Sequence, residues 1–258
     1  MARLIDANDD ETMERLTGIH AVREALASGR ALERIVVARG RHGERVEELV
    51  RLAREAGVPV RFEDRMQLDR MAGREEHQGV VAVAAAKRAE TLEDLIAQAG
   101  PEALVVLLDG IEDPRNLGAI ARSALAAGAA GLVIAERRAA GLTDTASRAA
   151  AGALEHLPVA RVPNMARAME ELKEAGWWLV GLDERAEKAH TEQDLSGRIA
   201  LVMGGEGKGL HELVRKRCDF LVAIPTVGPV RSLNVSVAAG VVLFEAVRQR
   251  RAKAGEKK

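Results

Sequence analysis

Apolar segments punctuated by turn residues run along the chain and predict alternating strands and helices. The apolar, often β-branched runs predict strands at 33–39, 58–62, 77–85, 103–109, 131–136, 157–162, 177–183, 198–205 and 221–225. Amphipathic or capped stretches predict helices at 19–29, 43–57, 64–73, 116–131, 143–156, 165–176, 209–218 and 233–250. Strands that alternate with helices predict an α/β fold whose mostly parallel sheet is covered on both faces.

A polar stretch with a Gly100-Pro101 break divides this series in two. We expect an acidic tail at 1–11, a small α/β unit at 12–86, a linker at 87–102 and a larger α/β unit at 103–258. The helix at 19–29 is expected to open directly after Thr17-Gly18.

Composition narrows the class of protein. The chain of 258 residues is 47% hydrophobic and 30% charged, which supports a buried core and a charged surface. It contains no apolar run of the ~18 residues that a membrane span needs, and its start lacks a signal-peptide core. Its one cysteine, Cys218, excludes an internal disulfide and a multi-cysteine metal site, and we expect a surface thiol there. A cytoplasmic protein without metal or membrane contact is predicted.

Charge and aromatic content give no global sign of nucleic-acid binding. The net charge is −1, and aromatic residues make up 2% of the chain, with no tyrosine. This argues against recognition of bases on an aromatic platform. If RNA is bound, local basic patches must bind it. Arg30, Arg39 and Arg41 flank the strand predicted at 33–39 and are candidates, although an arginine-rich solvated surface is the alternative.

Candidate chemistry lies in three loops that follow predicted strands, where ligands bind in such sheets. In the loop at 109–124, Asn116 stands where a helix begins and is either a helix cap or a site residue. Arg122 lies six positions later, and we expect it roughly on the same side of that helix. Its small and apolar neighbours predict a buried arginine that needs a partner.

The second loop, VMGGEGKGL at 202–210, is rich in glycine. It lacks the Ser or Thr that follows lysine in a Walker A loop, and it follows a late strand, unlike a dinucleotide fingerprint. Its glycines still permit a ligand to approach the backbone closely. Glu206 and Lys208 are either exposed loop charges or site residues.

The third loop, IPTVGPVRSLNVSVA, joins the last predicted strand to the last helix. Ser232, Asn234 and Ser236 stand where that apolar helix begins, and each is either a cap or a ligand-binding group.

Together, NLGAIAR, GGEGKGL and IPTVGPVRSLNVSVA resemble the motifs of the SpoU (also called TrmH) family of RNA ribose 2′-O-methyltransferases, in the family's order. Thr226 replaces a methionine that is common there. The first half, from LTGIHAVREAL to HQGVVAVAA, resembles the substrate-binding domain of bacterial members. The whole is most similar to members that methylate a guanosine of 23S ribosomal RNA.

The resemblance implies a SPOUT (α/β trefoil-knot) methyltransferase domain and a small L30e-like substrate-binding domain. It implies S-adenosylmethionine as cofactor, ribosomal RNA as substrate and a homodimer. By motif, cofactor contacts fall on Gly204, Gly205, Ile224 and Leu233. Catalytic roles fall on Asn116, Arg122, Glu206, Ser232 and Asn234, with Arg122 or Glu206 as the group that handles the proton.

Other interpretations stay open from the residues alone. A transfer RNA methyltransferase of the same family, an inactive RNA-binding adaptor and a nucleotide-binding oxidoreductase are the alternatives. The loop mismatches disfavour the oxidoreductase, and the presence of all motif polar residues disfavours the adaptor.

Overall fold

The computed structural model describes residues 13–73, 76–85, 90–137, 139–229 and 232–255. The chain forms two compact units, Met1–Arg88 and Ala89–Lys258. The predicted acidic tail at 1–11 lies outside the described residues. The boundary differs from the predicted linker at 87–102, because helix α4 (Leu92–Gln98) belongs to the second unit, with Leu92 and Leu95 buried in its core.

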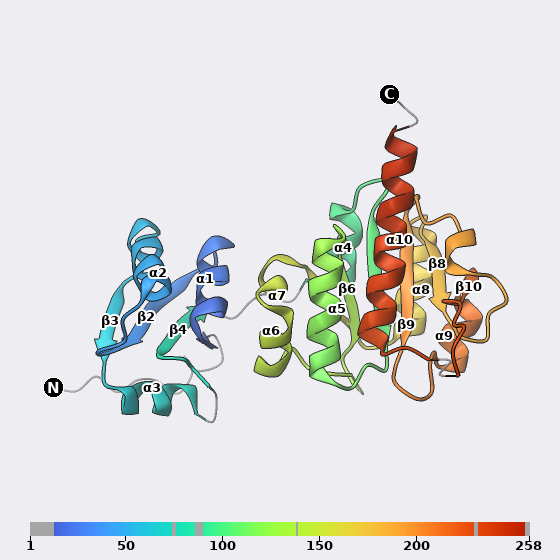
Figure 1. Ribbon diagram of the computed structural model, residues 1–258. Helices are drawn as coiled ribbons and strands as arrows, with labels where there is room; N and C mark the ends of the chain where they lie inside the picture. Colours follow the sequence, from blue (N-terminus) through green and yellow to red (C-terminus); the bar gives the residue numbers. More distant parts are fainter. Residues whose placement is uncertain (1–12, 74–75, 86–89, 138, 230–231, 256–258) are drawn as a thin grey trace. The chain divides into compact units, whose positions relative to one another are not determined.

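The first unit is a four-stranded mixed sheet with three helices (Figure 1). The strand order is β1-β4-β2-β3, in which β2 and β3 are parallel and the other pairs antiparallel. The strands are β1 (Met13–Thr17), β2 (Leu32–Ala38), β3 (Val60–Glu63) and β4 (Val80–Ala85). The helices are α1 (Ile19–Ala27), α2 (Glu44–Glu55) and α3 (Arg65–Ala72).

Strand β1 was not predicted from the sequence. Its residues MERLT are mostly polar, and only Leu16 and Thr17 are buried, so no apolar alternation marks it. It forms because it pairs antiparallel with the buried strand β4, from Met13 opposite Ala85 to Thr17 opposite Val81. Pairing with β4 therefore determines the strand conformation of a segment whose own sequence favours no particular structure.

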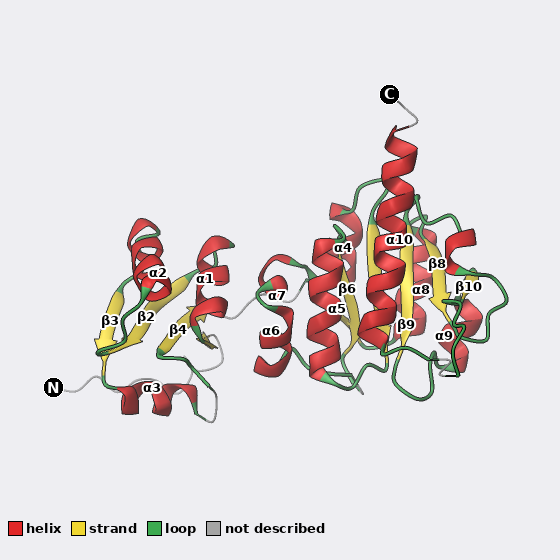
Figure 2. Cartoon of the chain, in the orientation of Figure 1, coloured by secondary structure: helices red, strands yellow, loops and turns green. Residues whose placement is uncertain are grey.

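The second unit is a six-stranded parallel sheet in the order β10-β8-β9-β5-β6-β7 (Figure 2). Its strands are β5 (Leu104–Asp109), β6 (Gly131–Ala135), β7 (Val159–Val162), β8 (Trp178–Leu182), β9 (Ile199–Gly204) and β10 (Phe220–Val222). Its further helices are α5 (Pro114–Ala126), α6 (Asp144–Ala150), α7 (Ala153–His156), α8 (Met165–Glu174), the 3-10 turn His190–Glu192, α9 (Glu212–Arg217) and α10 (Val235–Gly255). The predicted parallel α/β architecture is confirmed.

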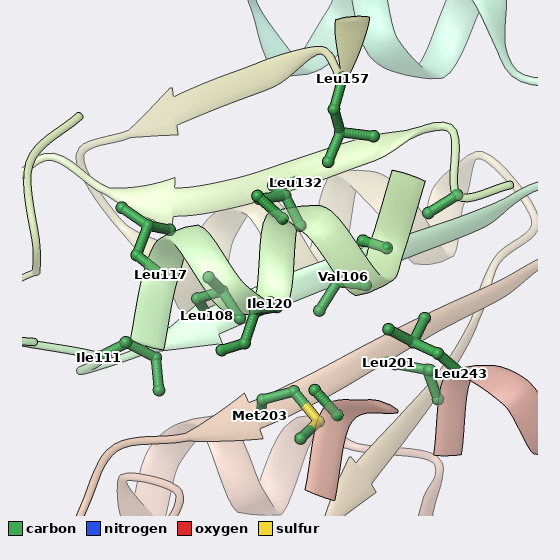
Figure 3. Close-up of a cluster of buried hydrophobic side chains, with 14 of the residues drawn as sticks. Val106, Leu108, Ile111, Leu117, Ile120, Leu132, Leu157, Leu201, Met203 and Leu243 are labelled. Carbon is green, nitrogen blue, oxygen red and sulfur yellow. The ribbon is translucent and has the colours of Figure 1, made fainter. Parts of the chain in front are cut away.

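Helices cover both faces of this sheet. Along β5, Leu104, Val106 and Leu108 face the layer of α5, α6, α7 and α10, whereas Val105 and Leu107 face α4, α8 and α9. Figure 3 shows the first of these cores, in which side chains of β5 and β9 meet those of α5 and α10. A strand buried on both faces reads as a continuous apolar run, which is why these strands were predictable.

The helix predicted at 143–156 is broken. α6 ends at Ala150, and Ala151 and Gly152 both adopt left-handed conformations, with φ of 47° and 87°, before α7 begins. α6 lies close against α5 because Gly118 leaves room: a Cβ atom added there would lie 2.2 Å from the carbonyl oxygen of Ala146. The break redirects the chain toward β7.

Cys218, expected as a surface thiol, is partly buried. Its Sγ donates to the carbonyl oxygen of Val214 at 3.4 Å and occupies space beside Gly181, where an added Cβ would lie 2.6 Å from it. Burial raises the pKa of this thiol to about 12, so it stays protonated and does not act as a nucleophile.

Candidate active site

The loops that follow β8, β9 and β10 meet at the carboxyl edge of the parallel sheet and enclose a cleft of about 580 Å³. Its wall is made by residues 182–185, 203–210, 224, 226, 232–235 and 238. The volume falls in the range of about 300–1,000 Å³ that is typical of small-ligand sites. All four residues predicted to contact a cofactor, Gly204, Gly205, Ile224 and Leu233, line this cleft.

Two adjacent glycines allow the loop after β9 to fold tightly. A Cβ atom added at Gly204 would lie 2.1 Å from the carbonyl carbon of Gly209, and one added at Gly205 would lie 2.0 Å from the carbonyl oxygen of Gly110. Neither distance is sterically possible. Where Gly204 and Gly205 line the cleft, no side chain stands between their peptide groups and a ligand.

A hydrogen-bonded cluster of polar side chains stands at the rim. The Nδ2 of Asn116 donates to Oε1 of Glu206, and Nδ2 of Asn234 donates to Oδ1 of Asn116 at 3.1 Å. The Oδ1 of Asn234 accepts from the backbone N–H of Ser236 at 2.9 Å and from its hydroxyl at 2.6 Å. Three loops far apart in the sequence thus hold one another through side chains.

The caps of α5 and α10 explain why the side chains of Asn116 and Asn234 can join the cluster. α5 begins at Pro114, earlier than predicted, and its N-cap is Asp113, whose Oδ1 accepts from the backbone N–H of Arg115 at 2.8 Å. Asn116 is therefore not the cap, and its side chain is free for the cluster. Asn234 caps the first turn of α10 and also belongs to the cluster, so its cap interpretation is confirmed and its ligand-binding interpretation stays a prediction.

Ser232 is exposed and lines the cleft beside Leu233 and Asn234. The third loop thus brings a hydroxyl to the same wall as the glycines of the second loop.

Arg122 does not follow its prediction. Six helical positions correspond to a rotation of about 240°, so Arg122 and Asn116 point to different sides of α5. Arg122 is exposed, and its guanidinium has no hydrogen bond or ion pair with any residue that the structure describes. The expectation of a buried arginine with a partner is wrong, and the carboxylate of Glu206 contacts Asn116.

The sequence analysis missed an ion-pair network on the cleft wall. Asp183, at the end of β8, is buried and accepts from Arg185 through Nε at 2.9 Å and Nη2 at 3.0 Å, and also from Arg215. The hydrogen bonds of Arg185 and then of Arg215 hold the pKa of Asp183 below its usual range. Its position directly after a predicted strand was the available signal.

Asp109, the last residue of β5, was also missed. Its Oδ2 accepts from the backbone N–H of His211 at 2.8 Å, and its Oδ1 lies 2.9 Å from Nδ1 of the same histidine. Its carbonyl oxygen accepts from the N–H of Gly205 at 2.9 Å. One residue therefore fastens both ends of the glycine-rich loop to the sheet.

The three arginines predicted to bind RNA differ in the structure. The guanidinium of Arg30 is 8% exposed and donates to the carbonyl oxygen of Ala85 and to Glu14, which ties β1 and β4 together. Its geometry is structural and does not fit the predicted RNA contact. Arg39 and Arg41 are exposed, and Arg39 donates through Nε to the carbonyl oxygen of Phe62 at 3.2 Å.

Among the described residues, no group of three or more His, Cys, Asp or Glu side chains is placed to hold a metal ion. No helix in the described part of the chain has the length and apolar character to cross a membrane.

Comparison with known proteins decides the family. Residues 103–244 match the model of the SpoU rRNA Methylase family, and residues 15–90 match the model for RNA 2′-O ribose methyltransferase substrate binding. The chain belongs to the SpoU methylase family. The second match corresponds to the small N-terminal unit, which is the family's substrate-binding domain.

Relatives of the SpoU chain cover nearly its whole length. A putative TrmH family tRNA/rRNA methyltransferase, YacO of Bacillus subtilis, is 44% identical over 90% of this chain and 94% of its own. The 23S rRNA (guanosine-2′-O-)-methyltransferase RlmB of Pseudomonas putida is 42% identical over 93% and 98%. The SpoU methyltransferase AviRb from Streptomyces viridochromogenes, solved with AdoMet, has a TM-score of 0.79 at 31% identity, over 96% of each chain.

The cleft fits the cofactor that this family uses. Its volume and the glycines in its lining suit an adenosine derivative that is bound partly through peptide groups. The chain is an S-adenosylmethionine-dependent RNA methyltransferase.

Proposed function

We propose that this chain methylates the ribose 2′-hydroxyl of a guanosine in 23S ribosomal RNA, in the cytoplasm. The observation that carries the proposal is the cluster of Asn116, Glu206 and Asn234 at the rim of the glycine-walled cleft. The substrate is inferred from the P. putida relative, which is named for that reaction. The complete cluster favours an active enzyme over an RNA-binding adaptor.

The side chains at the rim suggest a division of roles. S-adenosylmethionine supplies an electrophilic methyl group. We propose that the carboxylate of Glu206 accepts the proton that the ribose 2′-oxygen releases when it is methylated. Asn116 holds that carboxylate through its amide, and Asn234 holds Asn116, so the acceptor is oriented before substrate arrives. Ser232 contacts the ribose from the same wall.

Arg122 takes a different role from that of a base. A guanidinium offers hydrogen-bond donors and no acceptor, and this exposed one has no hydrogen bond or ion pair with any described residue. We propose that it grips a phosphate next to the target ribose with its planar fork of donors.

A homodimer is part of the proposal. Helix α10 buries one side against α5 and β9, yet large apolar side chains also follow its opposite side: Val237, Val241 and Phe244 are all exposed. Their spacing of four and three positions places them on one face. An apolar face of this length suits a second copy of the chain.

The trefoil knot stays a proposal as well. It is supported by the path of the chain, which leaves the edge strand β10 and returns over β9 to pack α10 against α5. A knot would be a rare exception to the usual rules of chain topology.

The test of the target uses labelled cofactor and RNA that carries no modification. An in vitro transcript of 23S ribosomal RNA and a pool of unmodified transfer RNA are incubated separately with the protein and methyl-labelled S-adenosylmethionine. Nuclease digestion and mass spectrometry then identify the labelled nucleoside. We expect 2′-O-methylguanosine from the 23S transcript. Label in transfer RNA alone would overturn the proposed substrate, and RNA binding without label would point to an adaptor.

A further inference from the structure

A groove in the substrate-binding domain lies between α2 and the end of β3. We call it the Phe62 groove; it has a volume of about 500 Å³, and its lining includes Arg41, Val46, Val50, Arg54 and Phe62. The volume is that of a small-ligand cleft. With 2% aromatic residues in the chain, a groove that contains an aromatic ring was not expected in this unit.

Phe62 forms an aromatic surface on a rigid support. It lies on the edge strand β3 opposite Val37, which is fully buried under α2, so its ring continues an apolar face. The ring extends beyond the part that α2 covers and is 48% exposed. Its backbone is fixed by the ladder with β2 and by the hydrogen bond from Arg39. An exposed ring on fixed backbone is suited to stack a flat ligand.

The rim of the groove carries free positive charge. Neither Arg41 nor Arg54 makes a side-chain hydrogen bond or ion pair with any residue in the described part of the chain. Two carboxylates, those of Glu47 and Glu55, also line the groove, but Glu55 is occupied by Arg51 at 2.7 Å. The combination of an aromatic surface and unpaired guanidinium groups fits a base with adjoining phosphates.

The position of Arg41 is set by a neighbouring turn. A Cβ atom at Gly79 would lie 3.1 Å from Cγ of Arg41, so the arginine stem lies over this glycine. The backbone N–H of Gly79 donates to Nδ1 of the buried His77 at 3.0 Å, and the other nitrogen of His77 lies 2.8 Å from Asp69. The support of Arg41 is thus a fixed turn, which favours a specific contact over a mobile surface charge.

We propose that the Phe62 groove binds one unpaired nucleotide of the RNA substrate, with its base stacked on Phe62 and its flanking phosphates on Arg41 and Arg54. The inference rests on the proposed function only for the choice of RNA as ligand. It assigns to the substrate-binding domain a contact that duplex RNA cannot make, because paired bases are not free to stack on a side chain.

The experiment measures RNA binding by the full-length protein without cofactor. The probe is a 12-nucleotide oligouridylate with a fluorescein label for anisotropy, and a second version carries one central 2-aminopurine, whose emission falls on stacking. Phe62→Leu keeps an apolar side chain but removes the ring; we expect it to raise the Kd by about 5- to 150-fold, the range for one base–aromatic stack, and to abolish the quenching. Phe62→Tyr should retain both. Met66→Ala, which truncates a 66% exposed side chain of the same unit outside the groove, should change neither.

Salt dependence separates the ring from the charges. Arg41→Ala and Arg54→Ala should each lower the slope of log affinity against log salt by about 0.7, the value for one single-strand phosphate contact, whereas Phe62→Leu leaves the slope unchanged. Wild-type affinity and quenching in Phe62→Leu would overturn the proposal, as would equal binding of the probe annealed to oligoadenylate. A change of oligomeric state in the Phe62 variants, without a change in RNA affinity, would assign the groove to contact with a second copy. None of these readouts needs methyl transfer, so failure here is distinct from failure of the proposed target.

Discussion

At the scale of single residues, the rim of the cleft depends on polar side chains that hold one another through hydrogen bonds. Glu206 stands at an exposed loop tip, yet the amide of Asn116 orients its carboxylate, and Asn234 orients that amide in turn. Arg122 lies outside this cluster and is exposed. The two charged residues therefore call for different tests.

Glu206→Gln tests proton acceptance. Glutamine keeps an oxygen that can accept from Asn116 but is not basic, so we expect single-turnover methyl transfer to fall about 10²- to 10⁴-fold, the usual contribution of a general base. Calorimetry should find S-adenosylmethionine affinity changed by little. Transfer at nearly the wild-type rate would remove Glu206 from the proton path.

Arg122→Ala tests the phosphate contact. We expect kcat/KM for RNA to fall by about 10- to 150-fold, which corresponds to loss of a hydrogen bond to a charged group, while cofactor affinity is retained. Arg122→Lys should recover little, because an ammonium group lacks the planar fork of donors. Full activity in the lysine variant would reduce Arg122 to a generic positive charge.

At the scale of elements, close approach between helices depends on Gly118 in α5. Gly118→Ala places a methyl group within 2.2 Å of the Ala146 carbonyl oxygen and 2.6 Å of the Ala149 Cβ. The helical preference for alanine is worth up to about 1 kcal/mol, whereas overpacking costs about 1–3 kcal/mol, so urea unfolding should show net destabilisation. Gly240→Ala is the control: its added Cβ lies 3.9 Å from Ser123 Oγ, and the variant should be as stable as wild type or more so.

Helix α10 is also tied to the loop before β9 through Glu245 and Gln249. Hydrogen bonds from Arg248, and then from Gln249, lower the pKa of Glu245 from 4.5 to about 2. A carboxyl whose pKa is depressed in the folded state stabilises the fold above pH 4.5 and loses that contribution as pH falls toward 2. The free energy of unfolding should therefore decline over this window, and Glu245→Gln should make the decline shallower. Identical pH profiles for both proteins would contradict the assignment.

The features of the fold that depend on local sequence pattern could be predicted from the sequence. The strands of the parallel sheet followed from their continuous apolar runs, and the three motif loops followed from polar residues at strand ends. Strand β1 depends on tertiary pairing with β4. The break at Ala151-Gly152 depends on two left-handed residues, and the start of α5 depends on the cap by Asp113. Arg30 and Arg122 were misplaced because a sequence does not reveal which arginine finds a carbonyl oxygen and which stays exposed.

At the scale of the whole molecule, the exposed apolar face of α10 predicts the assembly. Val241→Asp places a charge in the middle of this face, and we expect light scattering at micromolar concentration to change from a dimer to a monomer, since a buried unpaired charge is costly. Leu213→Asp adds the same charge to an exposed apolar position on α9 and should leave the mass unchanged. A wild-type protein that is already monomeric would rule out the dimer.

The side chain of Asn234 links the first turn of α10 to the polar cluster, which couples local unfolding of the helix to loss of the cluster. Its Oδ1 holds the first turn of α10, and its Nδ2 holds Asn116. We therefore expect fraying of that first turn to break the polar cluster in the same event, so that the helix start and the rim of the cleft open as one unit of local unfolding. Opening of this single helical turn would then inactivate the enzyme while the sheet beneath it is still folded.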